Sequence, residues 1–168
     1  EKSEISYNEN GLKEIIGSLE FNNVSFTYTE TNIKAIDNIS FKLNNRKSLG
    51  IIGVTGSGKT TLIKLITKIY NIEAGEILFD NNSINEYDLE CLRKQIGVVS
   101  QDSFLFSDSI INNIRFGKEK ATMKEVEKVC KIAGIHNEII KFSNGYETIL
   151  GERGINLSGG QKQRICIA

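Results

Sequence analysis

A glycine-rich loop at residues 53–60, with the sequence GVTGSGKT, is the feature that most constrains how this chain of 168 residues can fold. A short apolar run at residues 49–52 precedes the loop, and apolar residues at helical spacing follow it over residues 59–70. The first run predicts a buried parallel strand, and the second predicts a helix that begins inside the loop. A strand, a glycine loop and a helix in this order are typical of a phosphate-binding loop in an α/β domain.

This phosphate loop, residues 53–60, suits the binding of a nucleotide. Its glycines let the backbone wrap closely around an anion, with N–H groups and a helix N-terminus facing the charge. Lys59 supplies a positive charge for the β- and γ-phosphates, Thr60 offers a hydroxyl to Mg²⁺, and Thr61 can hydrogen-bond the α-phosphate. The candidate nucleotide-binding residues of this region are Gly53, Thr55, Gly56, Ser57, Gly58, Lys59, Thr60 and Thr61.

Composition excludes several classes of protein. Lysine and arginine number 21, as do aspartate and glutamate, so the zero net charge gives no basic face for a nucleic acid. The longest apolar runs are too short to cross a bilayer, and the N-terminus lacks the apolar core of a signal peptide. Cys91, Cys130 and Cys166 are odd in number and scattered, which favours inert thiols in a reducing cytosol over disulfides or a metal site.

Alternation of apolar and polar residues predicts antiparallel strands with one exposed face at residues 19–27 and 35–43. Two shorter apolar segments, residues 76–79 and 96–100, predict further strands. Together with the strand expected before the phosphate loop, they indicate an α/β core.

The middle of the chain predicts a helical subdomain at about residues 102–157. Thr122 followed by Glu125 fits a capping box, in which the two side chains cap each other's backbone N–H groups. Ser158 is expected to open a last helix. The helices expected within the subdomain lie at residues 109–114, 122–133 and 136–142.

Residues 157–161, with the sequence LSGGQ, predict a second anion-binding element. Ser158 at a helix start offers a capping hydroxyl, and Gly159 and Gly160 leave N–H groups exposed in a favourable helix dipole. This element would be redundant beside a complete phosphate loop if both bound one nucleotide. Extended to QKQR at residues 161–164 and placed after the phosphate loop, it closely resembles the signature of the ATP-binding-cassette (ABC) ATPases.

In that family two domains pair head to tail, and each signature closes on the γ-phosphate held by the other domain's loop. The resemblance therefore implies ATP and Mg²⁺ as cofactors and a second nucleotide-binding domain, identical or different, as a partner. It also implies that Ser158, Gly160 and Gln161 contact the nucleotide of that partner. The fold implied is a P-loop NTPase core with an antiparallel β subdomain and an α-helical subdomain.

Three further positions match the family's pattern. Tyr28, at the end of the first expected strand, stands where the family places an aromatic ring against adenine, although such a tyrosine is more often simple packing. Gln101 matches the glutamine that reaches Mg²⁺ and the attacking water, so it is expected to act in catalysis with Lys59 and to share the metal with Thr60. Residues 151–154, GERG, resemble a loop of ABC exporters that touches the coupling helices of the membrane domains.

The resemblance covers residues 19–168 and is closest to the nucleotide-binding domain of a fused exporter of the multidrug or lipid type. It implies an ATPase at the cytoplasmic face of a membrane, with transmembrane domains as partners and residues 1–18 as a linker from an upstream transmembrane domain. Nucleic acid is not expected as a partner. Two alternatives stay open: a soluble ABC ATPase of DNA repair or translation, and a fragment that binds nucleotide without hydrolysing it.

The sequence also departs from the family's pattern. Arg46 and Asn81 stand at positions that are usually glycine, of which asparagine tolerates left-handed backbone well. The 168 residues contain neither the Walker B strand with its catalytic glutamate nor the switch histidine, and His136 lies in the helical segment. The resemblance therefore implies a fold that is incomplete at its C-terminal end, with core surface uncovered beside the loop strand. This chain by itself is expected to show no turnover of ATP.

Overall fold

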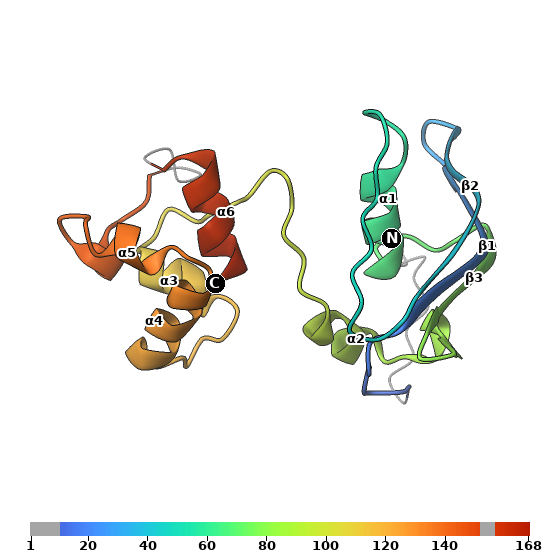
Figure 1. Cartoon of the computed structure of the whole chain (residues 1–168). Coiled ribbons are helices and arrows are strands. Elements are labelled where there is room, and N and C mark those ends of the chain that lie inside the picture. Colours follow the sequence, from blue (N-terminus) through green and yellow to red (C-terminus); the bar gives the residue numbers. More distant parts are fainter. Residues whose placement is uncertain (1–10, 152–156) are drawn as a thin grey trace. The chain divides into compact units, whose positions relative to one another are not determined.

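The computed structural model describes residues 11–151 and 157–168, which divide into two compact units, Glu1–Gly97 and Val98–Ala168 (Figure 1). Each unit has a hydrophobic core of its own. None of the helices in these described ranges is long and apolar enough to cross a membrane.

The first unit is built on an antiparallel sheet with the order β2-β1-β3-β4. The expected strands at residues 19–27, 35–43 and 76–79 are confirmed. Phe21 of β1 pairs with Phe41 of β2 on one side and with Ile77 of β3 on the other. The strands are β1 Leu19–Tyr28, β2 Ile33–Leu43, β3 Ala74–Phe79 and β4 Asn82–Ser83.

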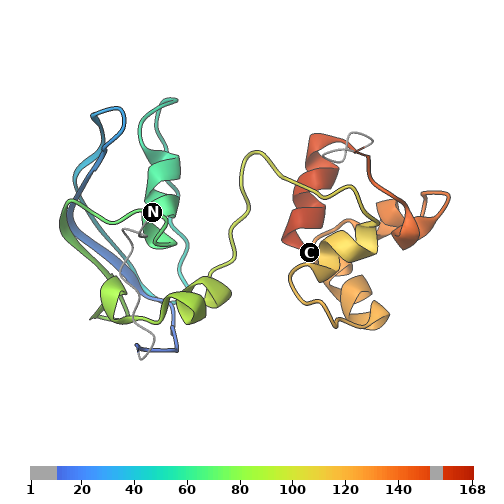
Figure 2. The same ribbon diagram turned by 180° about the vertical axis from the view of Figure 1, so that it is seen from behind.

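Helix α1, Lys59–Ile66, lies against one face of this sheet in both views (Figures 1 and 2). Its Leu62 and Leu65 are buried in the same core as Phe21 and Val24 of β1. Burial of this apolar stripe holds the helix on the sheet. The helix is shorter than the sequence predicts, because Thr67 ends it and Lys68 takes a left-handed φ of 53°.

The parallel strand expected at residues 49–52 and the further strand expected at residues 96–100 are wrong, since neither segment forms a strand. Apart from Ile96, which packs against the core of the first unit, their apolar side chains are exposed instead, and Ile52 is 99% exposed. A parallel strand exists only where neighbours accept and donate its backbone hydrogen bonds. Within the described residues every strand of the first unit's sheet pairs antiparallel, so these segments have no such neighbour.

Two helical elements of the first unit were not expected from the sequence. The 3-10 helix η1, Ile84–Glu86, begins with a capping box between Ser83 and Glu86. Helix α2, Leu89–Gln95, is capped by the Asp88 carboxylate, which accepts from the N–H of Cys91. Both starts carry a local capping signal that the sequence displays.

The second unit is helical, and its predicted helix starts are confirmed. Ser109, Thr122 and Ser158 each accept a hydrogen bond from a backbone N–H of the helix that follows. The expected helix at residues 136–142 is shorter than predicted, ending at Ile139. The elements are α3 Ile110–Arg115, α4 Met123–Ile132, α5 His136–Ile139, the 3-10 helix η2 Gly145–Glu147 and α6 Gly159–Ile167.

Both departures from glycine adopt left-handed backbone. Asp80 and Asn81, with φ of 52° and 65°, form a tight turn between β3 and β4, as the tolerance of asparagine predicts. Arg46 also has a positive φ, 59°, so this side chain occupies a conformation that glycine would adopt with less strain.

The turn between β3 and β4 also holds the entry segment, residues 11–18. The Asp80 carboxylate accepts hydrogen bonds from the N–H groups of Ile16, Gly17 and Ser18, at 2.6, 3.1 and 2.9 Å. The side chain of Gln95 binds the same segment through the N–H of Ile15 and the carbonyl of Lys13. The described part of the entry segment is therefore bound to the rest of the first unit by the side chains of Asp80 and Gln95, in addition to backbone hydrogen bonds of Leu12.

Asp80→Ala should destabilise the first unit, because it leaves three backbone N–H groups without their charged acceptor. Burial acts to raise the pKa of Asp80, but the hydrogen bonds from residues 16–18 outweigh it and hold that pKa below its ordinary value. We expect the free energy of unfolding at pH 7 to fall by about 1–3 kcal/mol in urea titrations followed by circular dichroism.

Because the folded state lowers this pKa, the stabilisation is complete above the ordinary aspartate pKa of about 3.9 and is lost as the pH falls through the folded value. The difference between wild type and Asp80→Ala should therefore shrink in acid. Asp37→Ala is the matched control, since its carboxylate is 70% exposed in a surface ion pair with Lys34. Equal losses in the two variants would contradict the prediction.

Candidate nucleotide-binding site

The phosphate loop depends on two glycines with left-handed backbone. Gly56 and Gly58 have φ of 82° and 86°, and Gly58 is the residue before α1. A Cβ on Gly58 would lie 2.3 Å from the carbonyl oxygen of Ala35 in β2, whereas one on Gly56 would meet nothing within 4 Å. The loop therefore needs glycine at position 58 for space as well as for conformation.

Lys59 turns its side chain back over the loop. Its ammonium donates to the carbonyl oxygens of Gly53 and Val54, at 2.8 and 2.7 Å, and to the Ser57 hydroxyl at 3.3 Å. The ammonium thus lies at the N-terminal end of α1, where the helix dipole also favours an anion. Thr55 and Thr60 are exposed, and Thr60 lies in the first turn of α1.

Tyr28 belongs to a cluster of aromatic rings beside α1. Its ring meets Phe26 and Tyr70 edge-on, with centroids 4.9 and 5.4 Å away. Its hydroxyl shares a hydrogen bond of 3.0 Å with that of Thr61, which is 5% exposed. The structure therefore brings together two predicted site residues, Tyr28 and Thr61. The Thr61 hydroxyl is already hydrogen-bonded to the Tyr28 hydroxyl.

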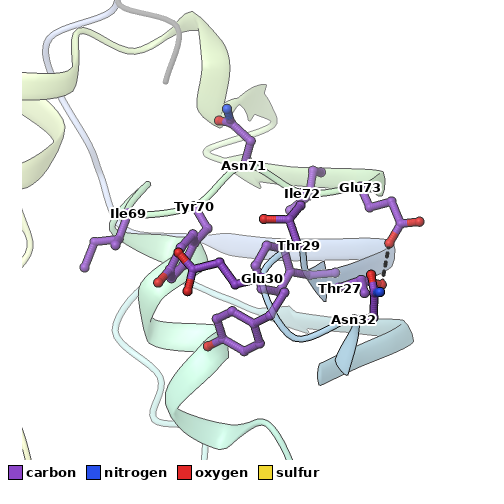
Figure 3. A pocket seen from close by; sticks show the side chains of 11 residues that line it. Thr27, Thr29, Glu30, Asn32, Ile69, Tyr70, Asn71, Ile72 and Glu73 are labelled. Atoms are coloured by element: carbon purple, nitrogen blue, oxygen red, sulfur yellow. Dashed lines mark hydrogen bonds between the residues drawn. The ribbon is translucent and has the colours of Figure 1, made fainter. Parts of the chain in front are cut away.

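A hollow of about 530 Å³ opens beside this cluster (Figure 3). Phe26, Tyr28 and Tyr70 line it with rings, while Glu30 and Glu73 place carboxylates in its wall. Figure 3 shows the hydrogen bond from Thr27 to Glu73, 2.8 Å long. Flat rings and carboxylates favour an aromatic group over a phosphate, so this hollow and the phosphate loop suit different parts of a ligand.

The signature turn, residues 157–161, opens α6 with a complete capping box. The Ser158 hydroxyl accepts from the N–H of Gln161 at 3.3 Å, and the Gln161 carboxamide oxygen accepts from the N–H of Ser158 at 2.9 Å. Gly159 and Gly160 are exposed. The first N–H groups of α6 therefore form a second anion-favouring helix start in the same chain.

Gln101 belongs to the second unit. It is exposed and lines a hollow of about 690 Å³ together with Gly159 and Lys162 of α6. Thr60, the other residue expected to hold the metal, belongs to the first unit. Of the exporter-type loop, Gly151 is described, whereas residues 152–154 lie outside the described ranges.

The histidine and the buried cysteines of the described ranges lie outside the phosphate loop and the signature turn. His136 Nδ1 lies 2.8 Å from the hydroxyl of Tyr146 and is held inside the helical unit. Burial raises the pKa of Cys130, as it does that of Cys166, which fits unreactive thiols. Over residues 11–151 and 157–168, no three histidine, cysteine, aspartate or glutamate side chains group as metal ligands.

Sequence reasoning missed Lys64, which lies beside the ring of Tyr28. The ammonium of Lys64 lies 5.7 Å from the ring centroid of Tyr28 and 5.6 Å from that of Tyr70. The position of Lys64, one helical turn after Thr61, was a usable signal for it. Glu138, which contacts the signature helix, was also missed, and nothing local in the sequence marks it.

The two loop glycines allow a direct test of this geometry. Gly58→Ala should lower the free energy of unfolding by more than Gly56→Ala, because both impose left-handed strain of about 1–2 kcal/mol but only the first also collides with Ala35. Thermal unfolding of the two variants measures the difference. Equal melting temperatures would contradict the close approach of Gly58 to β2.

Comparison with known proteins places this geometry in a family. The family described as ABC transporter matches residues 36–168. Multidrug resistance-like ATP-binding protein MdlA of Buchnera aphidicola is 51% identical over 165 residues, which cover 96% of this chain and 28% of that protein. Putative multidrug export ATP-binding/permease protein YgaD of Bacillus subtilis is 44% identical over 155 residues, covering 92% of this chain and 27% of that protein.

Among solved structures, that of a bacterial Atm1-family ABC exporter with ATP bound matches with a TM-score of 0.91 and 35% identity. The match covers 99% of this chain and 30% of that one, so the chain spans less than a third of the length of these relatives. The predicted ABC ATPase fold, α/β in character, is confirmed. On the evidence of its phosphate loop, its signature turn and these matches, the chain belongs to the ABC transporter family.

Proposed function

We propose that this chain is the ATP-binding and ATP-hydrolysing motor domain of a membrane exporter, at the cytoplasmic face of the membrane. The observation that carries the proposal is the presence of two anion-favouring helix starts in one chain, at α1 and at α6. A single nucleotide needs one phosphate loop, so the second helix start is free to serve another. Two domains paired head to tail would each supply one loop and one signature turn.

In the first unit the phosphate loop would hold the triphosphate of ATP. A bound phosphate would offer the Lys59 ammonium charged acceptors in place of the carbonyls of Gly53 and Val54. Backbone N–H groups between Thr55 and Gly58 would meet the β-phosphate, and Tyr28 would carry the adenine on its ring. The Thr61 hydroxyl, bonded to Tyr28, would set the orientation of that ring as well as lie near the α-phosphate.

Mg²⁺ fits the donors of this site, since hydroxyl and amide oxygens are the hard ligands that it prefers. Thr60, exposed in the first turn of α1, and Gln101, exposed in the second unit, would hold it. The ion would neutralise charge on the β- and γ-phosphates. The protein's own contribution is to position these groups and to exclude water, with Lys59 and Gln101 acting on the γ-phosphate and its attacking water.

The signature turn would act on the nucleotide of a partner domain. Ser158 would offer its hydroxyl and Gly160 its N–H to the partner's γ-phosphate, while Gln161 holds the turn closed through the capping box. Closure of such a pair would drive the membrane domains, and hydrolysis would reset them.

The exporter type is supported by the relatives, one named multidrug resistance-like and the other a putative multidrug export protein, and by the Atm1-family exporter among solved structures. Residues 1–18 would then lead from an upstream transmembrane domain, and residues 151–154 would face the membrane domains. No observation favours the soluble alternative of DNA repair or translation. Several apolar stretches of about 20 residues encoded upstream of Glu1 would support the exporter, and their absence would rule it out.

Lys59→Ala in the full-length protein should abolish productive binding and turnover of ATP. The variant removes the ammonium that meets the β- and γ-phosphates, and we expect kcat/KM for ATP to fall by at least on the order of a hundredfold. Phosphate release assays measure the effect. Lys47→Ala, which removes an exposed ammonium elsewhere in the same unit, is the control and should stay near wild type. Normal turnover in Lys59→Ala would refute the site.

A further inference from the structure

We propose that Glu138 of α5 is a positioning residue that fixes the signature turn for a partner's nucleotide. The inference rests on the proposed function, in which this turn meets the γ-phosphate of the partner domain. Glu138 lies 23 residues from Gln161 and 26 from Arg164 in the sequence, yet its carboxylate binds both.

The first link runs through Gln161. The carboxamide oxygen of Gln161 accepts from the N–H of Ser158, while its nitrogen donates to Glu138 Oε2 at 2.9 Å. Because one side chain makes both bonds, Glu138 sets which way the carboxamide faces. A carboxylate can only accept, so it orients the oxygen of Gln161 toward the backbone of Ser158.

The second link runs through Arg164, one turn further along α6. Its guanidinium donates to the other oxygen of Glu138, Oε1, at 2.5 Å. A Cβ on Gly160 would lie 3.4 Å from this guanidinium, so the arginine side chain lies close to the signature glycine. Glu138 thereby fixes the Arg164 guanidinium, which lies close to Gly160.

Helix α5 supplies a firm base for the carboxylate. Ile139, next to Glu138, is fully buried, and His136 of the same helix is hydrogen-bonded to the Tyr146 hydroxyl at 2.8 Å. The side chains of Glu138 and Arg164 are 37% and 35% exposed, so solvent only partly screens their attraction. One carboxylate with two charge-compatible donors leaves the first turn of α6 little freedom to rotate.

In the proposed dimer, Glu138 would affect the γ-phosphate without touching it, through the N–H groups of the signature turn. The exposed N–H groups of Gly159 and Gly160 stabilise a phosphate only if they already point at it when the domains close. Loosening the turn should therefore slow the step in which the signature meets a γ-phosphate. It should not alter the binding of nucleotide to the phosphate loop of the same chain.

The test uses Glu138→Gln in the full-length protein, which keeps the size of the side chain but brings an amide nitrogen to one of the two donors. We expect kcat for ATP to fall by on the order of tenfold, as for the loss of one part-screened charge-assisted bond. The affinity for ADP, which has no γ-phosphate, should be unchanged. Glu138→Asp, with its charge retained, should recover a larger share of kcat than Glu138→Gln.

Glu127→Gln is the matched control. Its carboxylate lies in α4 of the same unit, is 38% exposed and pairs with Lys131 of its own helix, so it resembles Glu138 in exposure and charge but has its ion pair within α4 rather than with α6. It should leave kcat unchanged. If both Gln variants lower kcat equally, or if ADP affinity falls together with kcat, Glu138 is merely structural and the inference is overturned.

A second experiment tests whether Glu138 acts on the nucleotide held by the partner copy rather than on that of its own copy. It uses dimers of two differently tagged full-length copies and measures nucleotide trapping. With Lys59→Ala and Glu138→Gln on separate copies, one loop still meets an unaltered signature turn. With both changes on one copy, no such pair exists, so trapping should be lower by about tenfold. Equal trapping, or the opposite order, would overturn the inference. Active Lys59→Ala alone would instead refute the proposed function.

Discussion

The contact between the phosphate loop and strand β2 is the constraint on which the first unit depends. Gly58 ends the loop with left-handed backbone, and its Cα faces the carbonyl of Ala35 too closely for any side chain. This contact fixes where α1 begins, and the start of α1 fixes where Lys59 and Thr60 stand. The burial of Leu62 and Leu65 then keeps the helix on the sheet. The same contacts that pack α1 into the core therefore also place the residues of the phosphate loop.

In the second unit, side-chain hydrogen bonds rather than close backbone packing fix the start of the helix. The start of α6 is held by Ser158 and Gln161, which cap each other, and by Glu138, which holds Gln161 and Arg164. Both units thus present the N–H groups of a helix start, one supported by a strand and the other by a hydrogen-bond network. The physical basis for anion binding is the same in each: unpaired N–H groups at the positive end of a helix.

Features that depend on neighbours in the sequence were predicted well. The capping box at Thr122 and the capping hydroxyl of Ser158 formed as expected, because each cap needs only residues three positions apart. The strands expected at residues 49–52 and 96–100 did not form, because a strand depends on pairing partners that no local pattern supplies. Helix α2 was missed although Asp88 caps it, since its seven residues carry little periodic signal.

The sequence by itself determined the family, the phosphate loop and the signature turn, since these consist of contiguous residues whose types and order define the chemistry. It could not show that the hydroxyl of Thr61 binds Tyr28, or that Asp80 holds residues 16–18. Only the tertiary structure decided that Glu138 contacts Gln161 and Arg164, 23 and 26 residues away. Such contacts depend on how separate elements pack, and packing is set by the whole buried core rather than by any short segment.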